Sequence, residues 1–387
     1  MLLGGSKEDN LYQVPDAEQH LDCLLSAGGN YIRNVMSCRD AGNVWPFAKV
    51  GDTYDLDRWN PEHWERFRRL LALTHERGIV VQLELWAFHD FKAAFDRNPW
   101  RPANNGNYAP SDTALTNTRS GGRSSTCPFF FSVPDLNNDK TLLRYQRRFV
   151  DKVLSISLDY DHVLYCMTNE IPPAYAPEWG WYWSAYVKAK AAERGTEVET
   201  SEMYWNPDFR DKQHNASFDY PAVYSYFECS QNSANSGETN WNMFMHIRQR
   251  LAAMPRPMNN TKLYGATGGH AWGGSDQDGI ERFWRALFAG CASARFHRPP
   301  TGLGLSETAR RHLRSARILT DTMNVFDCRP CNDLLSNRRE DGAFAFGNPG
   351  RVCAVYFPRG EQATVNRADM PSDSTVRWLE PARGAWT

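Results

Sequence analysis

Asn169 and Glu170, at the end of the apolar segment 163–170, are the residues whose types and position best suit chemistry. The segment is rich in β-forming residues and is followed at once by Ile171-Pro172-Pro173, which predicts a strand that ends at the carboxylate. In α/β barrels, reactive side chains stand at the carboxyl ends of the strands. There an acid can protonate a leaving oxygen, and the amide beside it can bond a hydroxyl group, which suits a sugar. The alternative is a solvated glutamate, or one held by Arg33 or Arg298, at an ordinary strand end.

Cleavage of a glycosidic bond usually requires a second carboxyl group. Glu202 ranks first, because it ends the predicted fifth strand, 198–203, beside aromatic residues and next to Glu170 around a barrel. The other candidates are Glu84, Glu228 and Asp276. If Glu202 activates a water, the reaction inverts and the carboxyl groups lie about 6.5–9.5 Å apart, whereas direct attack corresponds to about 5–5.5 Å. The alternative for Glu202 is an ion-paired or orienting acid.

Other side chains at or just past the predicted strand ends have types that bind sugars. Asn, His and Arg can hold hydroxyl groups or a uronate carboxylate, and Trp can stack on the face of a sugar ring. The predicted substrate contacts are Arg33, Glu84, Trp86, His89, Asn169, Trp205, Tyr226, Glu228, Asn232, His270, Trp272, His297 and Arg298. For each of them, a structural role without substrate contact is equally compatible with the sequence.

The order of elements that would position these residues predicts a (β/α)8 barrel. Short β-rich segments alternate with amphipathic helices, as in parallel α/β proteins. The predicted strands start at residue 2 and continue with 30–36, 79–86, 163–170, 198–203, 222–230, 262–266 and 292–297. The predicted helices are 17–26, 61–77, 140–158, 179–194, 241–254, 278–289 and 308–323. No Gly-rich phosphate motif follows the first strand, which disfavours a nucleotide-binding sheet. The long loop 87–139 suggests a functional role.

The last part of the chain has a different pattern. After Val325, short alternating segments at 342–346, 352–357, 363–365 and 375–379 are separated by Gly, Pro and Asn. They predict antiparallel strands. We therefore predict a barrel domain over 1–324 and a small β-domain over 325–387, which is either incomplete or packed against the barrel.

These segments together resemble a known group of enzymes. Gly28–Arg33 resembles the second strand of clan A glycoside hydrolases, which commonly brings an Arg to the active site, and Asn169-Glu170 matches their fourth-strand acid/base motif. Phe283–Ala294, Val352–Phe357 and Val376–Trp378 resemble bacterial apiosidase-like barrels with a C-terminal β-domain of the collagen-binding type. The resemblance covers nearly the whole chain. It implies a metal-independent glycoside hydrolase with Glu170 as general acid/base.

One departure from that group concerns the seventh strand. The resemblance implies a nucleophilic glutamate at its end, but the expected positions, Ala266 and Thr267, hold no carboxylate. Three interpretations stay open. Glu202 or another rim acid is the partner of Glu170; the chain is a non-catalytic glycan-binding barrel; or it is a retaining enzyme whose nucleophile has been replaced at Ala266 or Thr267.

Composition limits the partners. Lys+Arg 44 against Asp+Glu 45 gives a net charge of −1, so no overall field favours nucleic acid or an anionic membrane, and no apolar run is long enough for a membrane span. The 14 Trp, 16 Tyr and 20 Phe include enough aromatics to line a carbohydrate site as well as a core. We expect a carbohydrate substrate and leave the oligomeric state open.

Neither a metal nor another cofactor is expected. The chain contains no HExxH pattern and no GxSxG motif. Its nine Cys are an odd number, and Cys328-Arg-Pro-Cys331 is a lone CxxC that does not predict zinc. Residues 1–6 lack the features of a signal peptide and read as the inside of a strand, so we expect the natural start to be missing. Localisation stays open, although the resemblance implies the periplasm or secretion.

Overall fold

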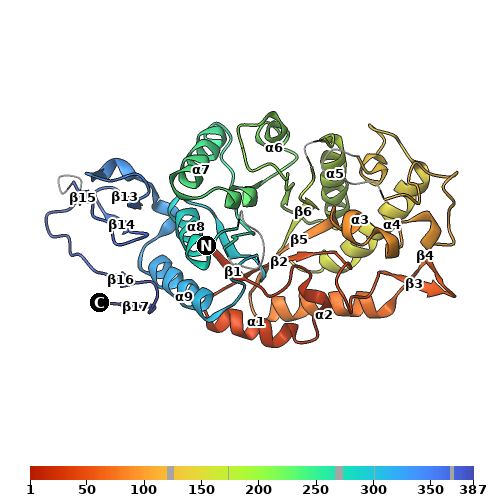
Figure 1. Cartoon of the computed structure of the whole chain (residues 1–387), viewed down its shortest axis with the longest axis horizontal. Helices are drawn as coiled ribbons and strands as arrows, with labels where there is room; N and C mark the ends of the chain where they lie inside the picture. The colour runs from red at the N-terminus through yellow and green to blue at the C-terminus, as the bar shows by residue number, and fades with distance from the viewer. Residues whose placement is uncertain (120–125, 173, 266–272, 300, 367–369) are drawn as a thin grey trace.

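The computed structural model describes residues 1–387 apart from 120–125, 173, 266–272, 300 and 367–369. Eight short parallel strands curl into a barrel (Figure 1). In chain order they are β1 (Leu2–Gly5), β2 (Tyr31–Val35), β5 (Val80–Ala87), β6 (Val163–Asn169), β7 (Thr200–Ser201), β8 (Phe227–Glu228), β9 (Met258–Asn259) and β10 (Ser293–Phe296). Six of them pair in the order β10-β1-β2-β5-β6-β7, and β8 pairs with β9.

Single backbone hydrogen bonds close the ring between these two groups. Ser225 N donates to Thr200 O over 3.0 Å, which joins β7 to the segment before β8. Ala292 N donates to Met258 O over 2.7 Å, which joins β9 to β10. Leu263 N also donates to Arg295 O over 3.0 Å. The predicted (β/α)8 architecture is confirmed.

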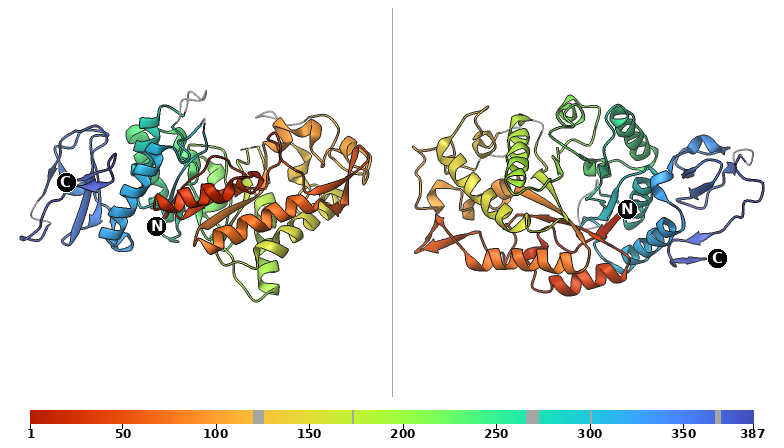
Figure 2. Two further views of the ribbon diagram at one scale, coloured as in Figure 1. Left: turned by 90° about the horizontal axis from the view of Figure 1, so that it is seen from below. Right: turned by 180° about the vertical axis from the view of Figure 1, so that it is seen from behind.

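Helices surround the barrel, and all of those named next except the short α6 lie at predicted positions (Figure 2). They are α1 (Ala17–Ser26), α2 (Pro61–Glu76), α4 (Lys140–Ser157), α5 (Glu178–Glu193), the short α6 (Asn215–Phe218), α7 (Gly237–Leu251), α8 (Asp276–Phe288) and α9 (Glu307–Thr322). Local signals set their bounds. In α2, the Asn60 side chain accepts from Glu62 N, Pro61 takes the first helical position, and Gly78 follows the last turn at φ 62°. None of the described helices is long and apolar enough to cross a membrane.

Two segments depart from the prediction. The seventh strand is β9 at Met258–Asn259, not 262–266, because the pairing of Met258 with Phe227 sets its register. Segment 262–266 instead touches β10 through an isolated bridge between Leu263 and Phe296. An antiparallel hairpin that was not predicted, β3 (Phe47–Val50) and β4 (Thr53–Trp59), precedes α2.

The described part of the long loop 87–139 is well packed. It contains the short helix α3 (Asp90–Ala93), and Trp100, Phe129 and Phe130 from this loop are buried against the outer face of the barrel. Trp100 and Phe129 lie edge to face at 5.2 Å. The loop therefore extends the hydrophobic core of the barrel.

The C-terminal residues form small antiparallel sheets, as predicted. A three-stranded sheet has the order β11 (Arg329–Pro330), β13 (Phe344–Asn348) and β14 (Val352–Tyr356). Two further pairs are β12 (Leu335–Ser336) with β15 (Thr364–Val365), and β16 (Leu379–Glu380) with β17 (Ala385–Trp386).

These sheets lie at one end of the molecule, beside α8 and α9 (Figures 1 and 2). Tyr356 stacks on Trp284 of α8 at 5.6 Å, and Phe344 lies 4.7 Å from Trp241 of α7. Arg285 of α8 pairs with Asp341 at 2.7 Å. The C-terminal segment is thus packed against the barrel, while a domain boundary at residue 325 stays a prediction.

Candidate functional site

Glu170 lies directly after β6, at the carboxyl end of the fourth barrel strand. Its backbone has φ 60°, the left-handed region that non-glycine residues rarely adopt. Such strain persists only where the surrounding structure fixes the residue, and it is common at functional sites. The backbone of the next residue, Ile171, is also held in place, because its N–H donates to Met203 O over 2.9 Å. The Glu170 side chain is 11% exposed, so it is largely but not fully shielded from water.

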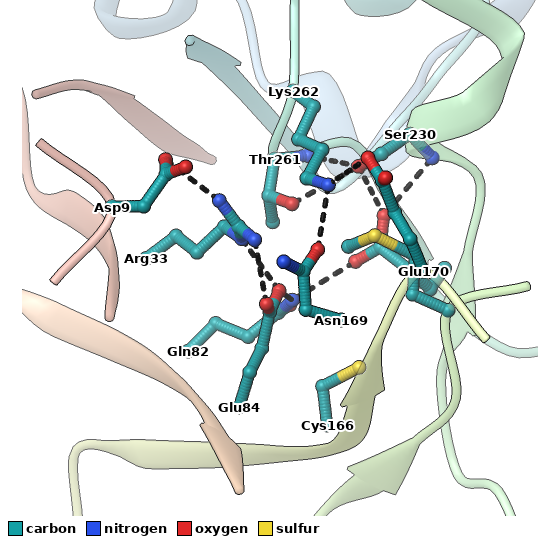
Figure 3. A network of polar contacts seen from close by, with 12 residues as sticks. Asp9, Arg33, Gln82, Glu84, Cys166, Asn169, Glu170, Ser230, Thr261 and Lys262 are labelled. Atoms are coloured by element: carbon teal, nitrogen blue, oxygen red, sulfur yellow. Dashed lines mark hydrogen bonds and ion pairs between the residues drawn. The ribbon is translucent and has the colours of Figure 1, made fainter. Parts of the chain in front are cut away.

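Four side chains contact the Glu170 carboxylate. Lys262 Nζ forms an ion pair with Oε1, and His89 Nε2 lies 2.8 Å from Oε2. Gln231 Nε2 and the Tyr264 hydroxyl each donate to Oε1 over 3.2 Å. Figure 3 shows the Lys262 amine between Asn169 and Glu170. The carboxylate is therefore a hydrogen-bond acceptor with cationic or polar donors on both oxygens.

The charge state of the pair follows from its surroundings. Burial alone would raise the pKa of Glu170, but the Lys262 ammonium and His89 outweigh it and hold that pKa well below its usual value. Burial lowers the pKa of Lys262, whereas the nearby Glu170 carboxylate favours the charged amine. Glu170 is thus an ionised carboxylate in the free protein, a state suited to accepting a proton and not to donating one.

Lys262 comes from the seventh barrel position, across the barrel from Glu170. It follows β9 by three residues, and its side chain is only 2% exposed. Its Nζ also donates to Asn169 Oδ1 over 2.7 Å. The fourth and seventh strands therefore present an acid and a lysine to each other. Ala266 and Thr267, the positions predicted for a replaced nucleophile, lie outside the described residues, and their role stays a prediction.

Beneath Glu170, the barrel interior is filled by an ionic network (Figure 3). Arg33 donates to both oxygens of Glu84 over 2.6 and 2.7 Å and pairs with Asp9 at 2.8 Å. Gln82 Nε2 joins Glu84 to Glu228 over 3.2 and 3.1 Å. Burial raises the pKa of Glu228 to about 7. Arg33, Glu84 and Glu228 are buried, so these predicted substrate contacts build the floor of the site and do not line its mouth.

Glu202 does not face Glu170. Its Oε1 accepts from Thr168 N over 2.8 Å and from Met203 N over 3.0 Å, and its Oε2 accepts from the Thr168 hydroxyl over 3.2 Å. The space beside Oε2 belongs to Gly180 of α5, where a Cβ would lie 2.6 Å from it. Burial raises the pKa of Glu202 to about 8. The carboxyl group thus lies between the strands and α5, a position that does not fit the predicted role of second catalytic carboxylate.

Other predicted contacts are also structural. Trp86 packs against Phe149, Trp179 and Trp183, between β5 and the outer helices, with ring centroids 5.2 to 5.9 Å apart. The Tyr226 hydroxyl donates to Tyr165 O over 2.9 Å inside the barrel. Asn232 Nδ2 donates to Asn240 O over 2.9 Å and holds the start of α7. Asp276, considered as a second acid, is an exposed residue at the start of α8. These four side chains do not point to the Glu170 carboxylate.

A second ionic group lies on the neighbouring part of the rim, around Asp9. His297 Nδ1 is 3.3 Å from Asp9 Oδ1, and Arg298 Nε is 3.1 Å from Asp9 Oδ2. The His297 ring lies edge-on to Tyr264 at 4.9 Å, which connects this group to Glu170. Burial lowers the pKa of His297 well below its usual value. His297 and Arg298 therefore reach the site through Asp9 and Tyr264.

The remaining predictions concern Trp205, His270 and Trp272. Trp205 is half-buried, and its backbone N–H donates to Ile171 O over 3.0 Å, so it stands next to the Glu170 turn. His270 and Trp272 lie outside the described residues. Of the predicted contacts, His89 and Asn169 take part directly in the cluster around Glu170.

Comparisons with known proteins were made for the whole chain. No family model matches it, and no curated protein matches it. Among solved structures, a glycoside hydrolase family 5 protein from Bacteroides vulgatus has a TM-score of 0.62 at 12% identity, over 96% of this chain and 79% of that chain. A family 5 mannosidase from Rhizomucor miehei has a TM-score of 0.52 at 12% identity, over 82% of this chain and 92% of that chain.

An endo-1,4-β-mannanase from Rhizomucor miehei gives a TM-score of 0.55 at 10% identity, over 83% of this chain and 95% of that chain. The chain therefore has the (β/α)8 fold that these glycoside hydrolases share. The closer resemblance to apiosidase-like proteins, and the collagen-binding type of the C-terminal segment, stay predictions. At these identities the likeness concerns the fold, and the chemistry has to be argued from the side chains.

Sequence reasoning missed four residues of the site: Asp9, Gln231, Lys262 and Tyr264. Lys262 and Tyr264 stand in the segment that was read as the seventh strand, and a lysine in a barrel strand is itself an unusual residue to bury. That lysine was the available signal. Asp9 and Gln231 follow β1 and β8 in connecting segments, where polar residues are ordinary, and nothing in their sequence context marks them.

Proposed function

We propose that this chain is a glycan-binding barrel built on a glycosidase fold, and that it holds its ligand at Glu170 without cleaving it by the two-carboxylate route. The observation that carries the proposal is the ion pair between Lys262 and Glu170. Glycoside hydrolysis by two carboxyl groups needs one of them protonated and the other ionised. Here Glu170 is ionised, and an ammonium group occupies the place opposite it.

No other acid offers itself as the partner. Among the described residues, Glu84, Glu228 and Glu202 are buried and bonded as set out above. The segment 266–272, which follows Lys262 and Tyr264, reads Ala-Thr-Gly-Gly-His-Ala-Trp and contains no carboxylate. The segment 120–125 contains none either. Asp9, the other acid described at this rim, is itself held by Arg33, His297 and Arg298. None of these four described carboxylates is therefore free to complete a catalytic pair with Glu170.

The rim nevertheless has the groups that recognise a sugar. His89 and Glu170 are partly exposed and can exchange hydrogen bonds with hydroxyl groups, and Trp205 is a half-buried aromatic ring beside them. Lys262, itself held by Asn169, fixes the Glu170 carboxylate, so the carboxylate presents a rigid acceptor. Because mannosidases and a mannanase share the fold, oligosaccharides derived from β-mannan are the first ligands to examine.

The test measures binding and turnover on the same protein. Isothermal titration with a panel of β-mannan-derived and other plant and algal oligosaccharides is combined with chromatography of the sugars after long incubation. We expect saturable binding, weakened by His89→Ala, and no product. Glu193→Gln, at the exposed end of α5, serves as the control and should bind like the wild type. The proposal is overturned if the protein binds none of the oligosaccharides. It is also overturned if product forms and Glu170→Gln abolishes its formation while Glu193→Gln does not.

The second candidate function is hydrolysis of a glycosidic bond with Glu170 as general acid/base. The observation that favours it is the placement of Asn169-Glu170 at the end of the fourth strand in a glycosidase barrel. Lys262→Glu separates the two candidates further. If Lys262 stands where a nucleophile is missing, this variant gains activity on aryl glycosides, and Lys262→Glu combined with Glu170→Gln loses it. A wild-type protein that is already active, with Lys262→Glu inactive, would assign a catalytic role to the lysine instead.

A further inference from the structure

The face of the barrel opposite Glu170 carries two histidines and an aspartate side by side. His75 lies in the last turn of α2, and Asp161 and His162 directly precede β6. One potential ligand atom from each of the three side chains lies within 4.8 Å of the other two. The backbone oxygen of His162 accepts from Val81 N of β5 over 2.9 Å, which fixes the position of its backbone. His162 precedes Glu170 by eight residue steps along β6, so the cluster is roughly 26 Å from Glu170.

The hydrogen bonds of Thr74 favour one tautomer of His162. Thr74 Oγ1 donates within α2 to the carbonyl oxygens of Leu70 and Leu71, over 2.9 and 3.0 Å. The same Oγ1 lies 2.9 Å from His162 Nε2. Since the hydroxyl proton is already used in the helix, Oγ1 accepts, and Nε2 carries the imidazole proton. Nδ1 of His162 therefore keeps its lone pair.

This lone pair has no partner. Nδ1 of His162 is buried and makes no hydrogen bond to the part of the chain that the structure describes. A buried nitrogen left in this state costs free energy, so it calls for a ligand. A neutral imidazole with one N–H held by a protein oxygen is the form in which histidine binds metals.

The other two side chains are placed to complete such a site. His75 Nδ1 is 4.0 Å from Asp161 Oδ1, too far for a hydrogen bond but near the separation of two ligands around one ion. The rings of His75 and His162 have centroids 5.3 Å apart, and Tyr160 packs edge-on against both. His75 and Asp161 are exposed at 56% and 94%, so their side chains can move the short distance that coordination requires.

We propose that His75, Asp161 and His162 bind a zinc ion, with water as the fourth ligand. Two imidazoles and a carboxylate suit the tetrahedral preference of Zn²⁺, and Thr74 orients His162 from behind. The ion would tie the end of α2 to the connection between α4 and β6. Residues at the amino-terminal face of a barrel serve stability and not catalysis. The site is therefore a structural clamp, independent of the carbohydrate function.

Zinc binding is measured on the full chain after treatment with a chelator. We expect one zinc ion per chain in isothermal titration and a higher melting temperature with zinc. Asp161→Asn and His75→Asn are exposed changes that should preserve the fold, and each should weaken the site by at least about tenfold. Asp159→Asn is the matched control, because Asp159 lies in the same connection but pairs with Arg194. It should bind zinc like the wild type.

Cysteine thiolates also bind zinc and could compete for the ion, so cobalt supplies a second readout. Co²⁺ held by two histidines and an aspartate gives tetrahedral visible bands without the thiolate charge-transfer band in the near ultraviolet. The proposal is overturned if the chain binds no zinc. It is also overturned if Asp161→Asn and His75→Asn bind as tightly as Asp159→Asn, or if the cobalt spectrum shows thiolate ligands.

Discussion

Replacing Lys262 with methionine tests the central interaction of the site. The substitution keeps most of the side-chain volume but removes the ammonium group that pairs with Glu170. The Glu170 carboxylate then keeps its bonds to His89, Gln231 and Tyr264. Removing one partner of a buried ion pair costs about 3–5 kcal/mol. Because Glu170 retains these donors and is 11% exposed, we expect a loss near the lower end, about 3 kcal/mol at pH 7.

The loss depends on pH in a defined direction. In the wild type the folded-state pKa of Glu170 is depressed, so its ionisation stabilises the protein above the unfolded-state pKa, and this stability disappears as the pH falls through the folded-state pKa. Without Lys262, burial is the dominant influence and the pKa of Glu170 rises. In the variant, ionising this buried acid lowers the free energy of unfolding as the pH increases above the unfolded-state pKa of Glu170. The difference between the two proteins is therefore largest near pH 7 and shrinks as the pH is lowered toward 4.

Urea unfolding followed by tryptophan fluorescence at several pH values between 4 and 7 measures this difference. Lys190→Met is the matched control, since Lys190 pairs with Glu193 at 2.9 Å on the exposed surface of α5. An exposed pair contributes about 0–1 kcal/mol, so the control should change little. Carbon NMR of the glutamate carboxyl groups should show one resonance whose pKa rises in Lys262→Met alone. Equal stability of the two variants at pH 7, or a loss that does not depend on pH, would refute the pairing of Lys262 with Glu170.

Three further predictions concern the residues around the site. Glu202→Gln should stabilise the protein by roughly 2–4 kcal/mol at pH 9 and leave it nearly unchanged at pH 5, because the raised pKa of Glu202, about 8, costs stability as the pH rises above the unfolded-state pKa. Unfolding at both pH values tests this, and glycan binding should be unchanged. Lost binding or turnover would instead give Glu202 a direct role at the site. Gly180→Ala should lower the free energy of unfolding by about 1–3 kcal/mol, because the added Cβ would meet Glu202 and Tyr224. A thermal melt measures the loss. Gly195→Ala, where the Cβ enters open space but φ is positive, serves as comparison. Glu84→Gln should destabilise by about 3 kcal/mol, because it leaves Arg33 with half of its carboxylate partners, and a loss below 1 kcal/mol in urea would contradict the network.

The helices and the fold class were accessible from the sequence because their signals are local. The predicted helix 17–26 coincides with α1, and 61–77 differs from α2 by one residue, since Asn60, Pro61 and Gly78 mark its ends. The short strands were harder. β7, β8 and β9 have two residues each, and their bounds follow from pairing with neighbouring strands, which a single sequence does not encode locally.

The errors in the site follow from those strand bounds. Glu170 was placed correctly, because its strand has seven residues and ends at a sharp chemical change. Glu202 directly follows the two-residue β7, where side-chain alternation cannot be read, and it turned out to point at α5. Lys262 was overlooked because the seventh strand was expected to begin at that residue, and a first strand residue lies far from the carboxyl rim. In the structure, β9 ends three residues earlier, which puts Lys262 at the rim.

The Lys262–Glu170 pair constrains what this barrel does more strongly than the fold. A buried lysine is costly on its own, and so is a buried carboxylate, but each charge offsets the other, and Lys262 also donates to Asn169. The pair is stable only while the proton stays on the lysine. To act as a proton donor, Glu170 would first have to be protonated, which opens the ion pair. The Lys262 ammonium group would then lose its only close carboxylate among the described side chains. This cost is the physical basis of our proposal that the ligand binds while the pair stays closed and is not hydrolysed.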